Sequence, residues 1–323
     1  MKPISVYINY IIKIIKCMIN LPRMEREIVL LRTILEKSID ITKIPKATGN
    51  LRKVQLIKTT LLNITDIILK KYNIQFWLEY GTLIGAIRHK GFIPWDDDID
   101  VCLLKENYLK LPKVFENELI KLGLTFKYGE KNGSQAIRLC YKDFSIDFFS
   151  MEYLNKRCNT KEEKADFVKK WLNVKQELFK NKKISDFVNN KINHFEIMPE
   201  ADELKKQIID KNYFQNPETK QIIRSVETMS KTDKCAVFEM ETIFPLQELD
   251  FEGTKLPAPK NPLQHLYEAN EYGEYGAVMN FPTIRDSGFV HVQETYVNSD
   301  VGYDKILEEV TQILENIKAK VGV

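Results

Sequence analysis

The spacing of apolar positions predicts two helices near the start of the chain and strands after them. Apolar residues recur every three or four positions over 24–40 and again over 51–72, which is the period of an amphipathic helix. The stretch IQFWLEYG, residues 74–81, is rich in aromatic and β-favouring residues and predicts a strand that ends in a turn at Gly81. A short helix is expected next, over TLIGAIRHK, residues 82–90.

Three further strands are predicted where apolar runs are bounded by polar or turn residues. They cover DDDIDVCLL (96–104), RLCYKD (138–143) and FSIDFFSME (144–152), and a tight polar turn separates the last two. We therefore expect the sheet to lie within residues 74–153.

The second half of the chain changes to lysine-rich amphipathic helices over residues 160–230. Their apolar side includes Phe167, Trp171, Val174, Leu178 and Phe179. A hairpin is predicted within 236–260, with its turn at Glu252 and Gly253. A final amphipathic helix is expected over 303–320.

The first twenty residues, MKPISVYINYIIKIIKCMIN, combine a wide apolar face with a narrow basic stripe. On a helical wheel Lys13 and Lys16 share one arc with Asn9 and Asn20. The opposite side is formed by Ile4, Ile8, Ile11, Ile15 and Ile19. The uninterrupted apolar stretch is far shorter than the ~20 residues that span a bilayer, and no small-residue cleavage pattern follows. Two interpretations stay open: a helix on the inner membrane surface, or a helix docked on the protein itself or on a second subunit.

Composition narrows the class of protein. With 323 residues, 44% of them hydrophobic, the chain can bury a large core and is a folded protein. Lys and Arg exceed Asp and Glu by only three, 48 against 45, which gives no indication of a nucleic-acid partner. The five cysteines are scattered without the paired spacing of a zinc site, so a reducing cytoplasm is the simplest setting.

Four carboxylates fall within five positions of the predicted second strand: Asp96, Asp97, Asp98 and Asp100. Because strand side chains alternate, Asp96, Asp98 and Asp100 should project to one side, with Asp98 and Asp100 about 7 Å apart. Carboxylates this close at the edge of an apolar core repel each other and require a cation. No Lys or Arg lies within the cluster, so Mg²⁺ is the expected partner. A solvated acidic turn is the alternative.

Two neighbouring features extend this predicted site. Gly81 can turn sharply and Thr82 can cap the following helix, whose first amides could then bind a phosphate. Asp147 stands inside an apolar run on the strand predicted over 144–152 and could supply a third carboxylate. The alternative for Asp147 is a structural role, either capping a loop or pairing with Arg138.

The block WLEYGTLIGAIRHKGFIPWDDDIDVCLL, residues 77–104, resembles the signature of the LicD family, which belongs to the nucleotidyltransferase-fold superfamily and is related to fukutin-type proteins. Later stretches resemble the carboxyl-terminal pattern of that family: IFPLQELDFEG (243–253), LPAP (256–259), YGEYG (272–276) and residues 282–285. In the broader superfamily the spacing from Thr82 to Asp98 is shorter, because the loop HKGFIPW is inserted here.

The resemblance implies an α+β fold, a nucleotidyltransferase-fold mixed sheet flanked by helices. Together with the apolar pattern of the N-terminal residues, it predicts a division of the chain into three parts. Residues 1–50 would form N-terminal amphipathic helices, and 51–158 a nucleotidyltransferase-like catalytic core. Residues 159–323 would form a helical, hairpin-containing region that completes the acceptor site.

The same resemblance implies a glycan-modifying phosphotransferase. Phosphocholine would move from CDP-choline onto a sugar hydroxyl of a cell-surface glycan precursor, such as that of a teichoic acid or lipopolysaccharide, and CMP would be released. The acceptor sugars would be assembled in the cytoplasm. Contact with the inner face of the membrane is suggested by the N-terminal helix and not by the resemblance. Asp98 and Asp100 would hold Mg²⁺ or Mn²⁺, and Asp147 would ligate the same or a second ion and accept the proton of the acceptor hydroxyl.

Further residues are assigned to binding the phosphate and the head group of the substrate. Phosphate binding is assigned to Gly81, Thr82, Arg88 and His89, although Arg88 and His89 could equally be surface charges at a helix end. A choline head group is held by ring faces, and the candidates are Trp77, Tyr80, Trp95, Tyr272 and Tyr275. Each of these aromatic residues could instead belong to the core.

Three other functions stay open. The transferred group could be ethanolamine phosphate or a pentitol phosphate. True nucleotidyl transfer, with pyrophosphate released, would use the same metal site. A noncatalytic membrane-associated scaffold is suggested by the N-terminal helix and the lysine-rich residues 160–191, but a scaffold gains nothing from costly buried charge.

Overall fold

The computed structural model describes residues 40–128, 136–180, 194–229, 234–269 and 302–321. The amphipathic segment 1–20, nearly all of the helix predicted over 24–40, and the motif stretches at 272–276 and 282–285 lie outside these residues. The chain divides into two units, one of Met1–Ile44 with Met279–Phe281 and one of Pro45–Val278 with Pro282–Val323. The described part of the first unit contains the short 3-10 helix η1 (Ile41–Lys43), and all other described elements belong to the second.

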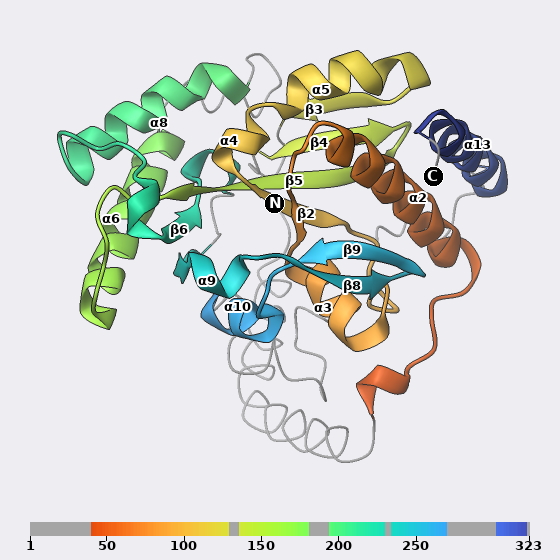
Figure 1. Cartoon of the computed structure of the whole chain (residues 1–323), viewed down its shortest axis with the longest axis horizontal. Helices are drawn as coiled ribbons and strands as arrows, with labels where there is room; N and C mark the ends of the chain where they lie inside the picture. Colours follow the sequence, from red (N-terminus) through yellow and green to blue (C-terminus); the bar gives the residue numbers. More distant parts are fainter. Residues whose placement is uncertain (1–39, 129–135, 181–193, 230–233, 270–301, 322–323) are drawn as a thin grey trace, which may run out of the picture. The chain divides into compact units, whose positions relative to one another are not determined.

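Helix α2 (Gly49–Lys71) confirms the helix predicted over 51–72. Its fully buried apolar side chains recur at helical spacing, and they include Val54, Ile57, Leu61 and Leu62. The helix ends where Asn73 takes a left-handed φ of 53°. The last predicted helix is confirmed as α13 (Tyr303–Val321), which lies alongside α2 (Figure 1).

Seven strands among the described residues form one mixed sheet (Figure 1). They are β1 (Trp77–Leu78), β2 (Asp100–Leu104), β3 (Thr125–Tyr128), β4 (Ile137–Tyr141), β5 (Phe144–Tyr153), β6 (Gln221–Arg224) and β7 (Val237–Glu239). The order is β1-β2-β5-β4-β3, while β6 pairs with β5 and β7 pairs with β6. Strands β2 and β5 run parallel, and the other pairs are antiparallel. A mixed sheet with helices around it confirms the predicted α+β class.

The sheet differs from the expectation in two ways. The prediction that it is confined to residues 74–153 is wrong, because β6 and β7 add strands from 221–239. Strand β5 has 10 residues and extends past β4, so residues 151–153 present an edge that β6 covers. The second strand begins at Asp100 and not at Asp96, since the preceding aspartates lie in a loop.

The remaining described helices connect and cover the strands. They are α3 (Tyr80–His89), α4 (Lys105–Tyr108), α5 (Leu111–Glu118), η2 (Ile120–Leu122), α6 (Lys161–Lys180), α8 (His194–Ile208), η3 (Pro217–Thr219), η4 (Val226–Thr228), α9 (Met240–Ile243) and α10 (Pro262–Ala269). The helix predicted over 82–90 is thus α3, two residues longer at its start.

Alternation along the strands divides the core between the two faces of the sheet. Val101 and Leu103 of β2 pack with Phe148 of β5 in the core that also contains residues of α2, α5 and α13. Cys102 of β2 and Phe149 of β5 belong to a separate core cluster, as expected for side chains on the opposite face.

The helices of the second half follow the prediction only in part. In α6 the side chains of Phe167, Trp171, Val174 and Leu178 are buried and Phe179 is half-buried, as expected. The helical prediction for 160–230 is wrong after α8, where the chain forms η3, β6 and η4. Strand β6 has 4 residues, which is too short for a reliable periodic signal in the sequence.

Four buried charges connect α8 to the sheet. Lys105 of α4 and Lys205 of α8 both pair with Glu152 of β5 and Glu227 of η4, at nitrogen-to-oxygen distances of 2.7–3.1 Å. Their side chains are 0–5% exposed. Because a buried ion is tolerated only beside an opposite charge, this cluster fixes α8 in one position.

The predicted hairpin forms a separate two-stranded sheet of β8 (Gln247–Phe251) and β9 (Thr254–Ala258). Its turn lies at Glu252 and Gly253, as expected, with φ angles of 51° and 85°. Two successive left-handed residues make the mirror-image turn whose twist suits a hairpin.

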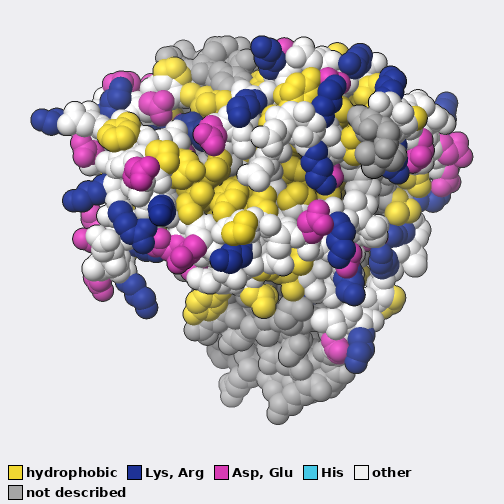
Figure 2. Space-filling model, viewed as in Figure 1, with side chains coloured by type: hydrophobic (Ala, Val, Ile, Leu, Met, Phe, Trp, Pro, Cys, Tyr) yellow, Lys and Arg dark blue, Asp and Glu magenta, His cyan; other side chains and the backbone are white. Residues whose placement is uncertain are grey.

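The surface carries charges of both signs. On the face in Figure 2, Lys and Arg side chains are interspersed with Asp and Glu, and hydrophobic side chains reach the surface in the middle of the view. No helix within the described ranges combines the length and the apolar character needed to cross a membrane. The domain boundary at residue 158 and contact with a membrane surface stay predictions.

Candidate active site

Helix α3 and strand β2 are joined at their amino-terminal ends. Glu79 donates its N–H to the carbonyl of Asp100 (3.0 Å), and Asp100 donates its own N–H to Thr82 Oγ1 (2.9 Å). The expectation that Thr82 caps the helix is wrong, because Glu79 takes the cap position. The sharp turn is made by Tyr80, with a φ of 48°, and not by Gly81. Thr82 instead holds the first residue of β2 beside α3.

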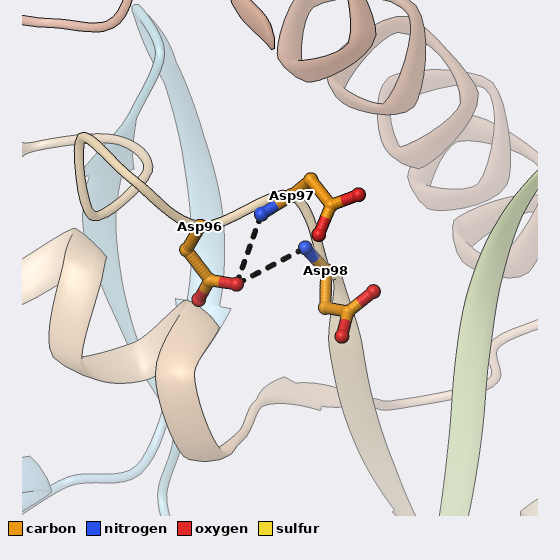
Figure 3. Close-up of side chains that lie close together, drawn as sticks. All are labelled: Asp96, Asp97 and Asp98. Atoms are coloured by element: carbon orange, nitrogen blue, oxygen red, sulfur yellow. Dashed lines mark hydrogen bonds between the residues drawn. The ribbon is translucent and has the colours of Figure 1, made fainter. Parts of the chain in front are cut away.

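The side chain of Asp96 organises the loop before β2. Its Oδ1 accepts the backbone N–H of Asp97 (2.9 Å) and that of Asp98 (3.3 Å), as Figure 3 shows. Its Oδ2 lies against Gly81, where an added Cβ would be 2.8 Å from that oxygen. A carboxylate therefore lies beside the first turn of α3, where the sequence predicted a phosphate and where negative charge is favourable.

The three aspartates of this loop lie close together. One carboxylate oxygen from each of Asp96, Asp97 and Asp98 lies within 4.8 Å of the others. Asp97 is buried, whereas the Asp98 side chain is 48% exposed. Burial alternates over these residues, with Asp96, Asp98 and Asp100 half-buried and Asp97 and Ile99 buried, but the strand begins only at Asp100, so the projection of the three aspartates to one side stays a prediction.

Asp147 lies directly beside Asp100. The two residues are register partners in the parallel pair of β2 and β5, and Asp147 donates its N–H to the carbonyl of Ile99 (2.9 Å). Side chains in register on neighbouring strands project to the same face of a sheet. The third predicted carboxylate is thus brought to the other aspartates.

The pair with Arg138, considered above as a structural alternative for Asp147, is also present. Arg138 of β4 donates Nε–H to Oδ1 (2.6 Å) and Nη2–H to Oδ2 (2.5 Å) of Asp147. Each carboxylate oxygen has two lone pairs, so both oxygens retain capacity for a further ligand. The ion pair and a metal site are therefore compatible.

The negative charge of Asp100 is unfavourable at its position. Burial, together with the negative charges of Asp147, Asp98 and Asp96, raises the pKa of Asp100 well above its usual range. The positive charge of Arg224 acts in the opposite direction. Such a carboxyl group ionises with difficulty until further positive charge is added.

Two cations near the aspartates were missed in the sequence. Lys58 of α2 is 4% exposed, and its Nζ lies 3.5 Å from Asp98 Oδ1. Arg224, the last residue of β6, lies over the rings of Tyr80 and Phe149, at 5.0 and 4.5 Å from their centroids. The sequence signal for Lys58 was a lysine on the apolar face of an amphipathic helix. The signal for Arg224 was an arginine at the end of an apolar stretch.

Glu79 is a further residue that sequence reasoning missed. Its buried carboxylate accepts a hydrogen bond from Trp77 Nε1 (2.6 Å) and contacts His265 Nε2 of α10 (2.7 Å). Together with its backbone bond to Asp100, this places Glu79 between β1, α3, β2 and α10. It fixes the start of the helix that faces the aspartates.

Arg88 and His89 lie in the last turn of α3, at the opposite end from Gly81 and Thr82. At a rise of 1.5 Å per residue, Arg88 is about 9 Å along the axis from Thr82. Arg88 is 5% exposed, so it is not the surface charge considered as an alternative, and His89 is half-buried. Their assignment to phosphate binding stays a prediction.

The aromatic residues proposed for a head group lie in different surroundings. Trp77 is fully buried, which favours a structural role. Tyr80 is half-buried, with Arg224 over its ring, and Trp95 is half-buried against the core. Tyr272 and Tyr275 lie outside the described residues. The head-group site stays a prediction.

The donor set fits a hard divalent cation. Oxygen ligands from carboxylates are those that Mg²⁺ and Mn²⁺ prefer. Among the described residues, several carboxylates and three cations lie in or beside this group, and the neighbouring negative charges raise the pKa of Asp100. The carboxylates include those of Asp96, Asp98, Asp100 and Asp147, and the cations are Lys58, Arg138 and Arg224.

Residues 73–191 match the model of the LicD/FKTN/FKRP nucleotidyltransferase domain. The matched segment contains α3, the aspartate loop, β2, β4 and β5. The chain contains a LicD-type nucleotidyltransferase domain. This confirms the family resemblance inferred from residues 77–104.

Three curated relatives illustrate the extent of the similarity. The lipopolysaccharide cholinephosphotransferase LicD of Haemophilus influenzae is 47% identical over 68 residues, which cover 21% of this chain and 26% of the relative. An uncharacterized protein of Rickettsia prowazekii is 37% identical over 89 residues, which cover 28% and 31%. The ribitol 5-phosphate transferase FKRP of Homo sapiens is 42% identical over 40 residues, which cover 12% and 8%. The chain thus spans less than a third of the length of each of these relatives.

The LicD-type domain does not contain the whole charge arrangement. Its residues supply the four carboxylates and Arg138. Lys58 precedes the matched segment, and Arg224 follows it. The site is therefore assembled from the LicD-type domain and from segments on both sides of it.

Proposed function

We propose that this chain catalyses metal-dependent transfer of a phospho-alcohol group, phosphocholine from CDP-choline, to a sugar hydroxyl of a cell-surface glycan precursor, releasing CMP. The observation that carries the proposal is the register pairing of Asp100 with Asp147 inside a LicD-type domain. Two relatives of the domain are named as a cholinephosphotransferase and a ribitol 5-phosphate transferase, which supports an enzyme of this reaction class.

The reaction exchanges one phosphorus–oxygen bond for another. The acceptor hydroxyl oxygen bonds to the phosphorus of the phospho-alcohol group, the bond from that phosphorus to the CMP oxygen breaks, and the hydroxyl proton passes to Asp147. Asp98, Asp100 and Asp147 would hold Mg²⁺ or Mn²⁺, which would supply positive charge for the pyrophosphate of the donor. Lys58 and Arg224, which lie near these carboxylates, add positive charge on the protein side.

The test is turnover of three donors, CDP-choline, CDP-ethanolamine and CDP-ribitol, with and without Mg²⁺, in the presence of a glycan acceptor extract. We expect metal-dependent release of CMP, fastest from CDP-choline. Asp98→Asn and Asp100→Asn should each lower turnover by about three orders of magnitude, since a catalytic metal supplies several kcal/mol of charge stabilisation. Asp166→Asn is the matched control, because that carboxylate is 61% exposed on α6 and pairs with Lys170.

The products separate the alternatives. Release of pyrophosphate in place of CMP would assign true nucleotidyl transfer. Fastest turnover of CDP-ribitol or CDP-ethanolamine would change the transferred group and leave the chemistry intact. Inactivity with all three donors, or near-normal activity of either aspartate variant, would contradict the proposal.

We also propose that the protein is cytoplasmic, with peripheral contact at the inner membrane face through the amphipathic segment 1–20. This part rests on the amphipathic pattern of the sequence. Flotation with liposomes of anionic and neutral lipids, with the full chain and with a chain that lacks residues 1–39, tests it. Liposome binding without any metal-dependent transfer would favour the scaffold function instead.

A further inference from the structure

The loop that carries the aspartates contacts polar residues from two distant parts of the chain. On one side lies α2, where Arg52, Gln55 and Lys58 recur every three residues and so share one face of the helix. On the other side lies the turn of the β8–β9 hairpin, at Glu252. Both lie outside the LicD-type segment 73–191.

Glu252 holds the first part of the loop. Its Oε1 accepts the backbone N–H of Phe92 (3.2 Å), and its own N–H donates to the carbonyl of Lys90 (2.8 Å). Its Oε2 accepts from Arg52 Nη2 (2.6 Å) and Lys46 Nζ (2.7 Å), and the side chain is 2% exposed. The turn of the hairpin is thereby connected to both α2 and the loop.

Two glycines allow this close packing. A Cβ added at Gly91 would overlap the Glu252 carboxylate, and one added at Gly85 would overlap the carbonyl oxygen of Gly91. The loop therefore folds back onto α3 on one side and against Glu252 on the other.

Gln55 holds the second part of the loop. Its side-chain Nε2 donates to the carbonyl of Asp96 (2.8 Å) and more weakly to that of Ile93 (3.4 Å). Asp96 also donates its N–H to the carbonyl of Ile93 (2.9 Å), which closes a turn just before the aspartates. Gln55 is 1% exposed, so these contacts are made away from water.

We propose that Glu252 and Gln55 are positioning residues for the cation site. They hold residues 91–96 at two successive points, and so set where the backbone delivers Asp98 relative to Asp100. The inference rests on the metal-binding part of the proposed function. A loop fixed at both points presents its carboxylates in one arrangement. A loop released at either point must become ordered when a cation binds, which lowers the affinity for the cation.

The test measures Mn²⁺ binding to the full chain by electron paramagnetic resonance, at a temperature well below the Tm of each variant. Glu252→Asn removes the long carboxylate but tolerates the left-handed φ of the turn, and Gln55→Leu removes the donor at similar size. Each should raise the Mn²⁺ Kd by about 10-fold, the lower range for loss of a contact behind metal ligands. Glu252→Gln retains an oxygen to accept the Phe92 N–H and should recover part of the affinity.

Asp250→Asn is the matched control, because this carboxylate lies on the same hairpin and pairs with Lys255 at 3.0 Å, both partly exposed. Its Mn²⁺ Kd should equal that of the wild type. Variants of Glu252 and Gln55 that lower the Tm but bind Mn²⁺ like the wild type would overturn the positioning role alone. A wild-type chain that binds no Mn²⁺ would overturn both this role and the metal assignment. If Glu252→Asn does not fold, Gln55→Leu decides by itself, since it acts on the same loop from α2.

Discussion

Replacement of Asp100 by Asn should change stability in opposite directions with and without a cation. The carboxyl group of Asp100 is partly buried beside Asp147, Asp98 and Asp96, and Arg224 opposes their negative charge. Without a divalent cation, the substitution removes a repulsive charge. With one, it removes a ligand.

The magnitude follows from the spacing of the strands. Neighbouring strands lie about 4.8 Å apart, and two charges about 5 Å apart repel by about 3 kcal/mol at an effective dielectric constant of 20. The positive charge of Arg224 reduces this value. We expect Asp100→Asn to raise the free energy of unfolding of the cation-free protein by about 1–2 kcal/mol, or the Tm by about 2–8 °C.

With Mg²⁺ bound, the wild type should be more stable than Asp100→Asn, the reverse of their order without a cation. A ligand at 100 times its Kd stabilises the native state by about 2.7 kcal/mol, and this gain belongs to the wild type. The assay is thermal unfolding followed by circular dichroism, in EDTA and at saturating Mg²⁺. Asp166→Asn, a surface carboxylate, should stay within about 0.5 kcal/mol of the wild type in both buffers. Two results would refute the reasoning. Asp100→Asn could be less stable than the wild type in EDTA, or its Tm could rise with Mg²⁺ by as much as the Tm of the wild type.

Three further predictions concern the surrounding scaffold. Lys205→Met leaves its buried glutamate partners without one cation, and urea denaturation should show a loss of about 3–5 kcal/mol. Gly85→Ala forces a Cβ against the backbone oxygen of Gly91, and the same measurement should show a loss of about 1–3 kcal/mol. For Glu252→Gln the prediction is a pH dependence. Burial raises the pKa of Glu252, but hydrogen bonds from its two cationic partners outweigh burial and lower it overall. A lowered pKa adds stability above the unfolded value of about 4.3 and loses it as the pH falls through the folded value, so the deficit of the variant should disappear in acid.

The carboxylates could be predicted because their signals are local. Asp98 and Asp100 stand two positions apart in an alternating segment, and Asp147 interrupts an apolar run. Both patterns are read within a few residues of the sequence, and the parallel register then brought Asp100 and Asp147 together, while Asp98 lies in the loop just before β2. The hairpin turn at 252–253 was predictable for the same reason, since a Glu-Gly pair between two strand-like runs suits left-handed residues.

The cations and the supporting residues could not be placed in the same way. Lys58, Arg224 and Glu252 lie far from the aspartates in sequence and reach them only through tertiary packing. Strand β6, which carries Arg224, exists as a strand because β5 offers it an edge. The role of Thr82 was missed because the left-handed residue at the start of α3 is a tyrosine, which sequence rules for turns do not favour.

The same dependence on flanking segments predicts that residues 73–191 alone do not form a functional unit. Helix α2 buries apolar side chains in the core shared with β2 and β5, and each contributes about 1.5–3 kcal/mol. Val54, Ile57, Leu61, Leu62, Ile64, Ile68 and Leu69 belong to this set. Their combined contribution is comparable with the whole stability of a domain, about 5–15 kcal/mol. A fragment of 73–191 should therefore lack cooperative unfolding and bind Mn²⁺ weakly. A fragment of 45–323 should unfold cooperatively and bind Mn²⁺ as tightly as the full chain. Because Lys58 and Arg224 are also absent from the fragment, a cooperative, tightly binding 73–191 would mean that neither the packing of α2 nor the two cations is needed at the aspartates.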